Sequence, residues 1–241
     1  MPEKYAHISF DDVFSSLRWL VTNRPPSVFD MDFYGTLRDW HERFGAVFSL
    51  YVFDSDDFFS LSEIPQQYWQ DFSKAAKWLK FGFHAGHKNT DVMHTTSKDF
   101  EKSFATCVNH IKAFASPQGV CYRLRLHSWS ANSKQIDILR RNGINSLFCR
   151  DNDGLSYDLL PKEEKQMRAS GYFEKNGIVY RPTDLRYDNC ADISALLLPL
   201  ISNTQKEIVL FGHERFFGDS VKQVEKSIVL LKENGYRFLA E

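Results

Sequence analysis

Long hydrophobic runs are missing from this sequence of 241 residues. No apolar stretch approaches the roughly 20 residues that a helix needs to cross a bilayer. The first residues, Met1-Pro2-Glu3-Lys4, also lack the basic-then-apolar pattern of a secretory signal peptide. We therefore expect no membrane partner and a cytoplasmic location.

Cysteine is scarce, and its spacing excludes the common cysteine-based sites. None of the four cysteines forms a CxxC pair, so we expect buried free thiols rather than disulfides or a zinc knot. The sequence also contains no GxGxxG and no GxxxxGK[ST], so it gives no support for a dinucleotide site or a P-loop. The formal net charge of −1 gives no reason to expect a nucleic-acid partner.

Aromatic residues, in contrast, are abundant. The chain has 21 Phe, 10 Tyr and 5 Trp, within a composition that is 43% hydrophobic and 25% charged. That composition is ordinary for a globular protein, and the chain is long enough to bury a sizeable core. Most of these rings should pack inside, and the others are available to line a binding cleft.

Strand and helix patterns alternate along the chain. The predicted strands cover 5–10, 46–53, 80–83, 119–129, 144–149 and 207–211. The predicted helices cover 13–21, 33–44, 66–79, 97–115, 132–141, 193–201 and 219–234. Between 155 and 189 the alternation gives way to a β-hairpin excursion with strands at 172–174 and 177–180. We predict one α/β domain over 1–241, an irregular (β/α) barrel of seven strands, with an open doubly wound sheet as the alternative.

Acids and histidines stand where the predicted strands end. Asp11 and Asp12 follow the first strand, and His84 and His87 follow the third. His213 ends the last strand. Parallel α/β folds bind ligands at the carboxyl ends of their strands, and carboxylate with imidazole is a common set of zinc ligands. One Asp of the pair could instead serve only as a helix cap.

Three of these segments resemble the motifs of one family. Phe10-Asp11-Asp12 resembles the first motif of the metal-dependent polysaccharide deacetylases, and Phe83-His84-Ala85-Gly86-His87 resembles the second. The terminal strand with His213 resembles the last motif. Val13 stands where the family has Gly, and the two histidines are three residues apart rather than four.

The resemblance implies a role for each residue. Asp11 would be the catalytic base and His213 the general acid, while Asp12, His84 and His87 would hold a divalent metal, most simply Zn²⁺. His94 is the alternative third ligand, because it lies within reach of the same loop.

A third family motif corresponds loosely to 122–129, although its proline pair is missing. From it we expect Arg125, His127 and Trp129 to bind substrate. Arg125, if buried, needs a carboxylate partner, for which Asp11 is the candidate, whereas on a strand edge it would face solvent. A further acidic motif corresponds to Asp151-Asn152-Asp153.

The function implied is removal of acetyl groups, bound as amide or ester, from a saccharide by metal-activated water. Two alternatives stay open. A metal-free sugar-processing enzyme could use Asp11 or Asp12 with Glu214 as paired carboxylates. A non-catalytic homologue would only bind carbohydrate.

Overall fold

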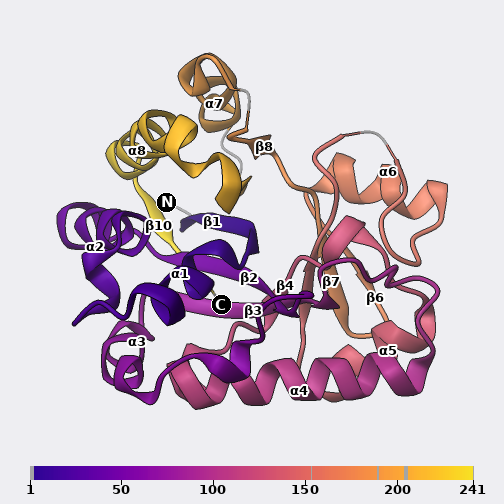
Figure 1. Ribbon diagram of the computed structural model, residues 1–241. Helices are drawn as coiled ribbons and strands as arrows, with labels where there is room; N and C mark the ends of the chain where they lie inside the picture. Colours follow the sequence, from indigo (N-terminus) through magenta and orange to yellow (C-terminus); the bar gives the residue numbers. More distant parts are fainter. Residues whose placement is uncertain (1–2, 153, 189, 204–205, 241) are drawn as a thin grey trace.

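A computed structural model describes residues 3–152, 154–188, 190–203 and 206–240 (Figure 1). The strands are β1 Lys4–Val13, β2 Phe48–Ser55, β3 Leu79–His87, β4 Arg123–Leu124, β5 Ser146–Phe148, β6 Phe173–Lys175, β7 Ile178–Arg181, β8 Leu185–Arg186, β9 Glu207–His213 and β10 Tyr236–Phe238. The helices are α1 Ser15–Asn23, α2 Asp32–Phe44, α3 Trp69–Ala75, α4 Ser97–Ala115, α5 Ser133–Arg141, α6 Pro161–Ser170, α7 Ile193–Ser202 and α8 Phe217–Glu233.

The strands form two sheets in which neighbours are parallel except for β6 and β7. The first sheet has the order β3-β2-β1-β9-β8, and β10 pairs with the beginning of β1. The second has the order β4-β5-β7-β6. One parallel bridge between Phe81 and Val120 links β3 to the segment before β4. The α/β class and the mostly parallel arrangement are thus as predicted. The described strands pair as two sheets joined by this bridge, and a closed barrel of seven strands stays a prediction.

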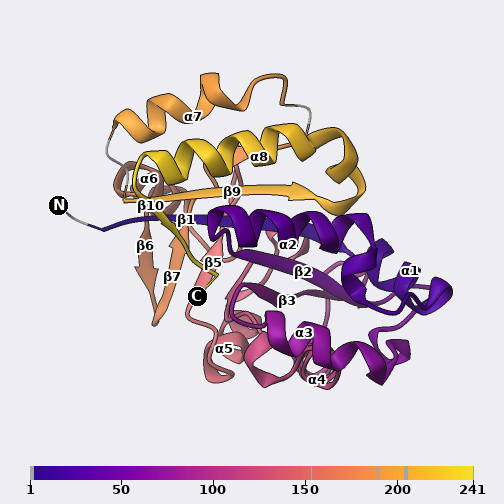
Figure 2. The ribbon, with the colours of Figure 1, turned by 90° about the vertical axis from the view of Figure 1, so that its left-hand side faces the viewer.

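β1 lies at the centre of the first sheet and is buried on both faces. Ile8 and Phe10 are fully buried, and so are His7 and Ser9, whose side chains point to the opposite face of the sheet. Helices lie around the outside of the strands, with α2 and α8 on one side and α4 on another (Figures 1 and 2). α4 buries the stripe expected from its sequence, Phe100, Phe104, Cys107, Ile111 and Phe114. Because β1 is covered on both sides, only its end is open for chemistry.

Two predictions about strands were wrong. The strand predicted over 119–129 is reduced to β4, because the backbone leaves extended geometry in a 3₁₀ turn at His127–Trp129. Ser128 and Trp129 have φ of 58° and 51°, which a strand does not accommodate.

The hairpin β6–β7 is present, with Asn176 and Gly177 at positive φ in its turn, as a two-residue hairpin requires. It is not an excursion, however, because β7 also pairs in parallel with β5. This segment therefore belongs to the sheet.

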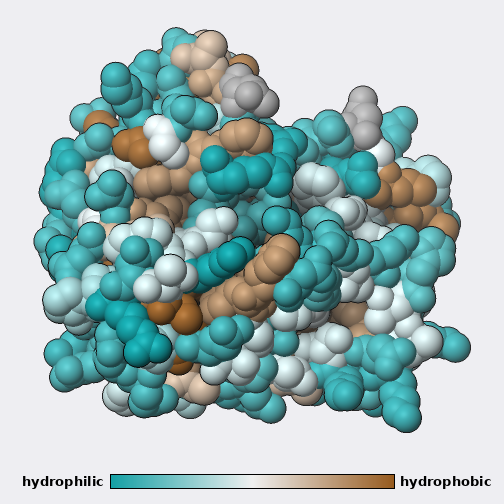
Figure 3. All heavy atoms as spheres, in the orientation of Figure 1, coloured by the Kyte–Doolittle hydropathy of each residue, from teal (hydrophilic) through white to brown (hydrophobic). Residues whose placement is uncertain are grey.

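The surface and the cysteines agree with the composition. The face in the view of Figure 3 is mostly hydrophilic, with hydrophobic residues in small separate groups. All four cysteines are free, and Cys107, Cys121 and Cys149 are buried. Among the described residues, no helix is both long and apolar enough to span a membrane.

Candidate active site

A cavity of about 210 Å³ opens where β1, β3 and β9 end. Most of the side chains that sequence analysis singled out line it. The lining residues are Asp11, Asp12, His84, Leu126, His127, Ser128, Trp129, Arg186, His213 and Arg215. A larger hollow of about 680 Å³ lies near Tyr5 and Glu207, where β1 and β9 begin. Active sites of parallel α/β folds lie at the opposite, carboxyl ends of the strands.

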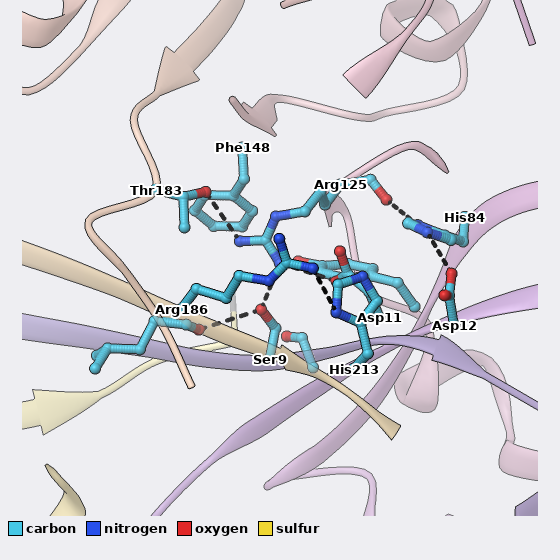
Figure 4. Close-up of polar contacts among 12 residues, drawn as sticks. Ser9, Asp11, Asp12, His84, Arg125, Phe148, Thr183, Arg186 and His213 are labelled. Atoms are coloured by element: carbon cyan, nitrogen blue, oxygen red, sulfur yellow. Dashed lines mark hydrogen bonds and ion pairs between the residues drawn. The ribbon is translucent and has the colours of Figure 1, made fainter. Parts of the chain in front are cut away.

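Asp12 and His84 face each other across this cavity (Figure 4). The pairing register of β1 shifts between Phe10 and Val13, and Asp12 has φ of 55°, so its carboxylate turns toward β3. His84 Nδ1 lies 2.6 Å from the main-chain oxygen of Arg125, to which it donates, and this leaves Nε2 3.3 Å from Asp12 Oδ1. Asp12 Oδ1 is buried and has no hydrogen bond. A neutral His84 would thus aim a lone pair at a carboxylate oxygen, an arrangement that needs a proton or a cation.

The electrostatics of the pair are consistent with that need. Burial raises the pKa of Asp12, but the interaction with His84 outweighs it and lowers the pKa to about 2. Burial lowers the pKa of His84, but the Asp12 and Asp11 carboxylates outweigh it and the pKa is raised. With no other cation bound, the pair is stabilised as an ion pair.

Asp11 is fixed by a buried arginine. Arg125 Nη1 donates to Asp11 Oδ1 at 2.9 Å and to Ser9 Oγ at 2.8 Å, and Nη2 donates to Thr183 Oγ1 at 3.2 Å. The guanidinium also lies 4.4 Å from the centre of the Phe211 ring. Arg125 is fully buried and does not line the cavity, so the prediction that it contacts substrate was wrong. Its pairing with Asp11 is confirmed.

His213 is held by an aspartate that sequence analysis missed. His213 Nδ1 donates to Asp188 Oδ2, and its main-chain N–H donates to Asp188 Oδ1 at 3.0 Å. Arg186 Nε also donates to Asp188, at 2.8 Å. Burial raises the pKa of Asp188, but the hydrogen bonds from His213 outweigh it and the pKa is lowered. The only signal in the sequence was the Arg186-x-Asp188 spacing, which puts both side chains on one side of an extended segment.

Glu214 and Arg215 follow His213 and serve different purposes. Glu214 accepts hydrogen bonds from the N–H groups of Phe14, Ser15 and Ser16 at 2.7, 2.8 and 2.5 Å, and so caps α1. It does not line the cavity, so its use as one of two paired carboxylates is wrong. The capping role considered for Asp11 or Asp12 is wrong too, because Glu214 fills it.

Arg215 Nη1 donates to Asp12 Oδ2 at 2.9 Å. This places a second positive group at the carboxylate that His84 faces.

His87 and His94 do not lie at the cavity. β3 continues as a strand through His87, so side chains alternate and a residue three positions from His84 points the other way. His87 Nε2 lies 3.5 Å from Asp57 Oδ1, and His94 pairs with Asp91 at 2.8 Å. Gly86, between the two histidines, is still part of the extended strand.

The turn 127–129 brings two of the predicted side chains to the cavity. The His127 ring centre lies 5.3 Å from that of His84. Trp129 lines the same space, with Arg150 5.2 Å from its ring centre. Asp153 of the predicted acidic motif lies outside the described residues, and Asp151 does not line the cavity.

The donors present fit a divalent ion in part. Asp12 Oδ1 and His84 Nε2 supply two converging donors, one of them an orphaned buried oxygen. Within the described ranges, however, no group of three His, Cys, Asp or Glu side chains could hold an ion, and zinc in proteins normally has at least three such ligands. Two of the predicted ligands therefore fit, and the third does not.

Comparisons with known proteins bear on the fold. Neither a protein-family model nor a curated protein matches the sequence. Among solved structures, the Xyl-CE4 domain of a xylanase from the hindgut metagenome of Trinervitermes trinervoides is 12% identical at a TM-score of 0.55, covering 98% of this chain and 87% of that one. A family 4 acetyl xylan esterase from Clostridium thermocellum, in complex with a cobalt ion, is 11% identical at a TM-score of 0.54, covering 98% and 87%.

A 4-alpha-glucanotransferase from Thermococcus litoralis is 12% identical at a TM-score of 0.65. It covers the whole of this chain, which spans 40% of the length of that enzyme.

The likeness to the Xyl-CE4 domain and to the family 4 acetyl xylan esterase shows that the chain has the fold of the CE4 structures. Its resemblance to the polysaccharide deacetylases is thus confirmed at the level of the fold.

Proposed function

We propose that this protein is a hydrolase that removes an acyl group, most simply acetyl, from a saccharide. The observation that carries the proposal is the set of four side chains at one cavity. Asp12 and His84 face each other there, with Asp11 held by Arg125 and His213 held by Asp188 beside them. Two of the structural relatives are named for related chemistry, as a CE4 domain and as an acetyl xylan esterase.

Asp11 is the proton acceptor in this proposal. It lines the cavity while 2% exposed, and one of its oxygens is engaged by Arg125. The buried guanidinium fixes the orientation of the carboxylate, which a general base for an attacking water requires.

His213 is the proton donor. Asp188 holds Nδ1–H, so the other ring nitrogen, Nε2, is the one that can give a proton to the leaving oxygen or nitrogen. Because Asp188 fixes the orientation of the ring, it is a positioning residue for His213.

Asp12 and His84 would hold a divalent ion, which would supply charge stabilisation for the acyl oxygen and for the attacking water. His127 lies beside His84 and lines the cavity, but no group of three such side chains among the described residues could hold an ion, so we assign no third ligand. Zn²⁺ remains the simplest ion for a carboxylate and an imidazole.

A second candidate is a carbohydrate-binding or carbohydrate-processing homologue that works without a metal. It is favoured by the two-donor site and by Arg215, which already places a cation on Asp12. The likeness to a glucanotransferase also supports it, since that enzyme acts on saccharides.

Acetyl release from acetylated xylan by protein dialysed against Zn²⁺ or Co²⁺ tests the proposal. The Asp11→Asn and His213→Gln variants should keep their metal content and lose turnover by about 10²–10⁴-fold, the usual size of a lost acid or base. Wild-type turnover in both variants would remove the assigned roles. Saccharide binding without acetyl release under any metal condition would favour the second candidate.

A further inference from the structure

Two arginines stand at the cavity in addition to the groups used in the proposed reaction. Arg186 comes from β8 and Arg215 from the turn after β9 (Figure 4 labels Arg186). Their side chains are 36% and 56% exposed. Neither is buried like Arg125. Arg186 donates from Nε to Asp188, and its Nη2 lies 3.2 Å from His213 Nδ1, whereas Arg215 makes one polar contact within the described part of the chain, to Asp12.

The carboxylates of the site are already engaged by other groups. Asp11 is paired with Arg125, Asp188 accepts from His213 and Arg186, and Asp12 faces His84 as well as Arg215. Each of these carboxylates therefore already has an Arg or His partner before a ligand binds. A neutral sugar would give the two guanidinium groups no charge to bind.

Arg215 has the most capacity to spare. A guanidinium has five N–H donors, and the contact to Asp12 uses one nitrogen of Arg215, Nη1. Its other contact is the Phe216 ring, whose centre lies 4.9 Å away and holds the group in place from one side. A planar guanidinium with free donors suits a carboxylate, which it can bind through two parallel hydrogen bonds.

We propose that the cavity takes a saccharide that carries a carboxylate, such as a uronic acid, and that Arg215 recognises this group. The inference deepens the proposed function and rests on the same site. Arg215 is a specificity-determining residue in this account, and Arg186 adds positive charge at the same opening while it orients Asp188.

A pair of ligands that differ only in the acid tests the inference. Xylotetraose and the same oligosaccharide bearing one glucuronic acid, both without acetyl groups, are titrated calorimetrically against the metal-treated protein. The acidic ligand should bind at least tenfold more tightly in low salt, since a charge-assisted pair is strong and screened by ions. The Arg215→Gln variant should lose this difference, and Arg215→Lys should keep part of it.

Arg237→Gln is the matched control. Arg237 is 72% exposed and pairs with Glu3, and it does not line the cavity, so its loss should leave the preference unchanged. A melting curve for each variant verifies folding.

Equal affinity for the two ligands in the wild type would overturn the inference, and so would an equal effect of Arg215→Gln on both. Tight binding of a sulfated oligosaccharide with none of the glucuronate-bearing one would overturn the assignment to a carboxylate. Acetyl release from neutral acetylated xylan is measured separately. Release without preference for the acidic ligand leaves the proposed function standing, and preference without release leaves only the binding inference.

Discussion

Glu214→Ala removes the cap of α1 and should destabilise the protein strongly. Three N–H groups lose their acceptor, those of Phe14, Ser15 and Ser16. Ser15 is exposed, so water can replace the carboxylate at its N–H, whereas Phe14 and Ser16 are buried. A buried donor left unpaired costs about 1–3 kcal/mol, so two of them make the expected loss about 2–6 kcal/mol.

The assay is thermal unfolding followed by circular dichroism. For a chain of this size, each kcal/mol shifts Tm by about 2–4 °C, so a drop of about 4 °C or more is expected. Asp192→Ala is the matched control, since this aspartate caps α7 from an exposed position by accepting from Ser194 at 3.1 Å. Loss of such an ordinary cap costs about 1 kcal/mol.

The same variants separate the capping role from a catalytic one. Glu214→Gln keeps one acceptor oxygen and should lie between the wild type and Glu214→Ala in stability. If Glu214 were instead one of two catalytic carboxylates, Glu214→Gln would abolish turnover at unchanged Tm. That outcome would refute the reasoning from the hydrogen bonds.

Three further predictions concern the metal, pH and the cavity wall. His84→Ala should reduce bound metal sharply while His87→Ala retains it, as measured by mass spectrometry of dialysed protein. The reverse would return the ligand role to His87. The pKa of buried His7 is held well below its usual range by burial and by nearby arginines. The contribution of neutral His7 to the free energy of unfolding is therefore fully present above about pH 6.5, and it falls by about 1.4 kcal/mol for each pH unit below that. Urea unfolding at pH 7.5 and 5.5 should show this loss in the wild type and less of it in His7→Gln; equal losses would contradict the assignment. Tyr157→Phe removes a hydroxyl that donates to the main-chain oxygen of Phe148 and accepts from the main-chain N–H of Leu126. Because this change loosens the turn that carries Trp129, it should raise KM for the saccharide more than it lowers kcat. An unchanged KM would contradict this.

The parts of the site that lie on strands could be predicted from the sequence. Asp11, Asp12 and His213 follow apolar runs directly, and parallel strands end at one edge, so their convergence followed from local pattern alone. The pairing of Arg125 with Asp11 was predicted only for the case that Arg125 is buried, because a buried guanidinium requires a carboxylate; the sequence left a solvent-facing strand edge open as the alternative.

The parts that depend on turns could not be predicted in the same way. Whether the side chains of His84 and His87 point to the same side of the sheet depended on where β3 ends, and no residue in that segment marks its end. Asp188 follows a strand of only two residues, too short to give a periodic pattern. The positive φ at Ser128, which rules out a long strand there, has no glycine to announce it.

The pairing of β1 with β9 has a consequence for how the chain acquires its structure. Arg215 and Asp12 are 203 positions apart in sequence, and Glu214 caps the first helix across a similar interval. During synthesis β1 therefore lacks this second neighbour until β9 has been made. Long-range pairing of this kind slows folding and leaves apolar edges exposed to aggregation in the meantime. Because β1 pairs with the distant β9, we expect the protein to depend on chaperones and to form inclusion bodies at high expression temperature.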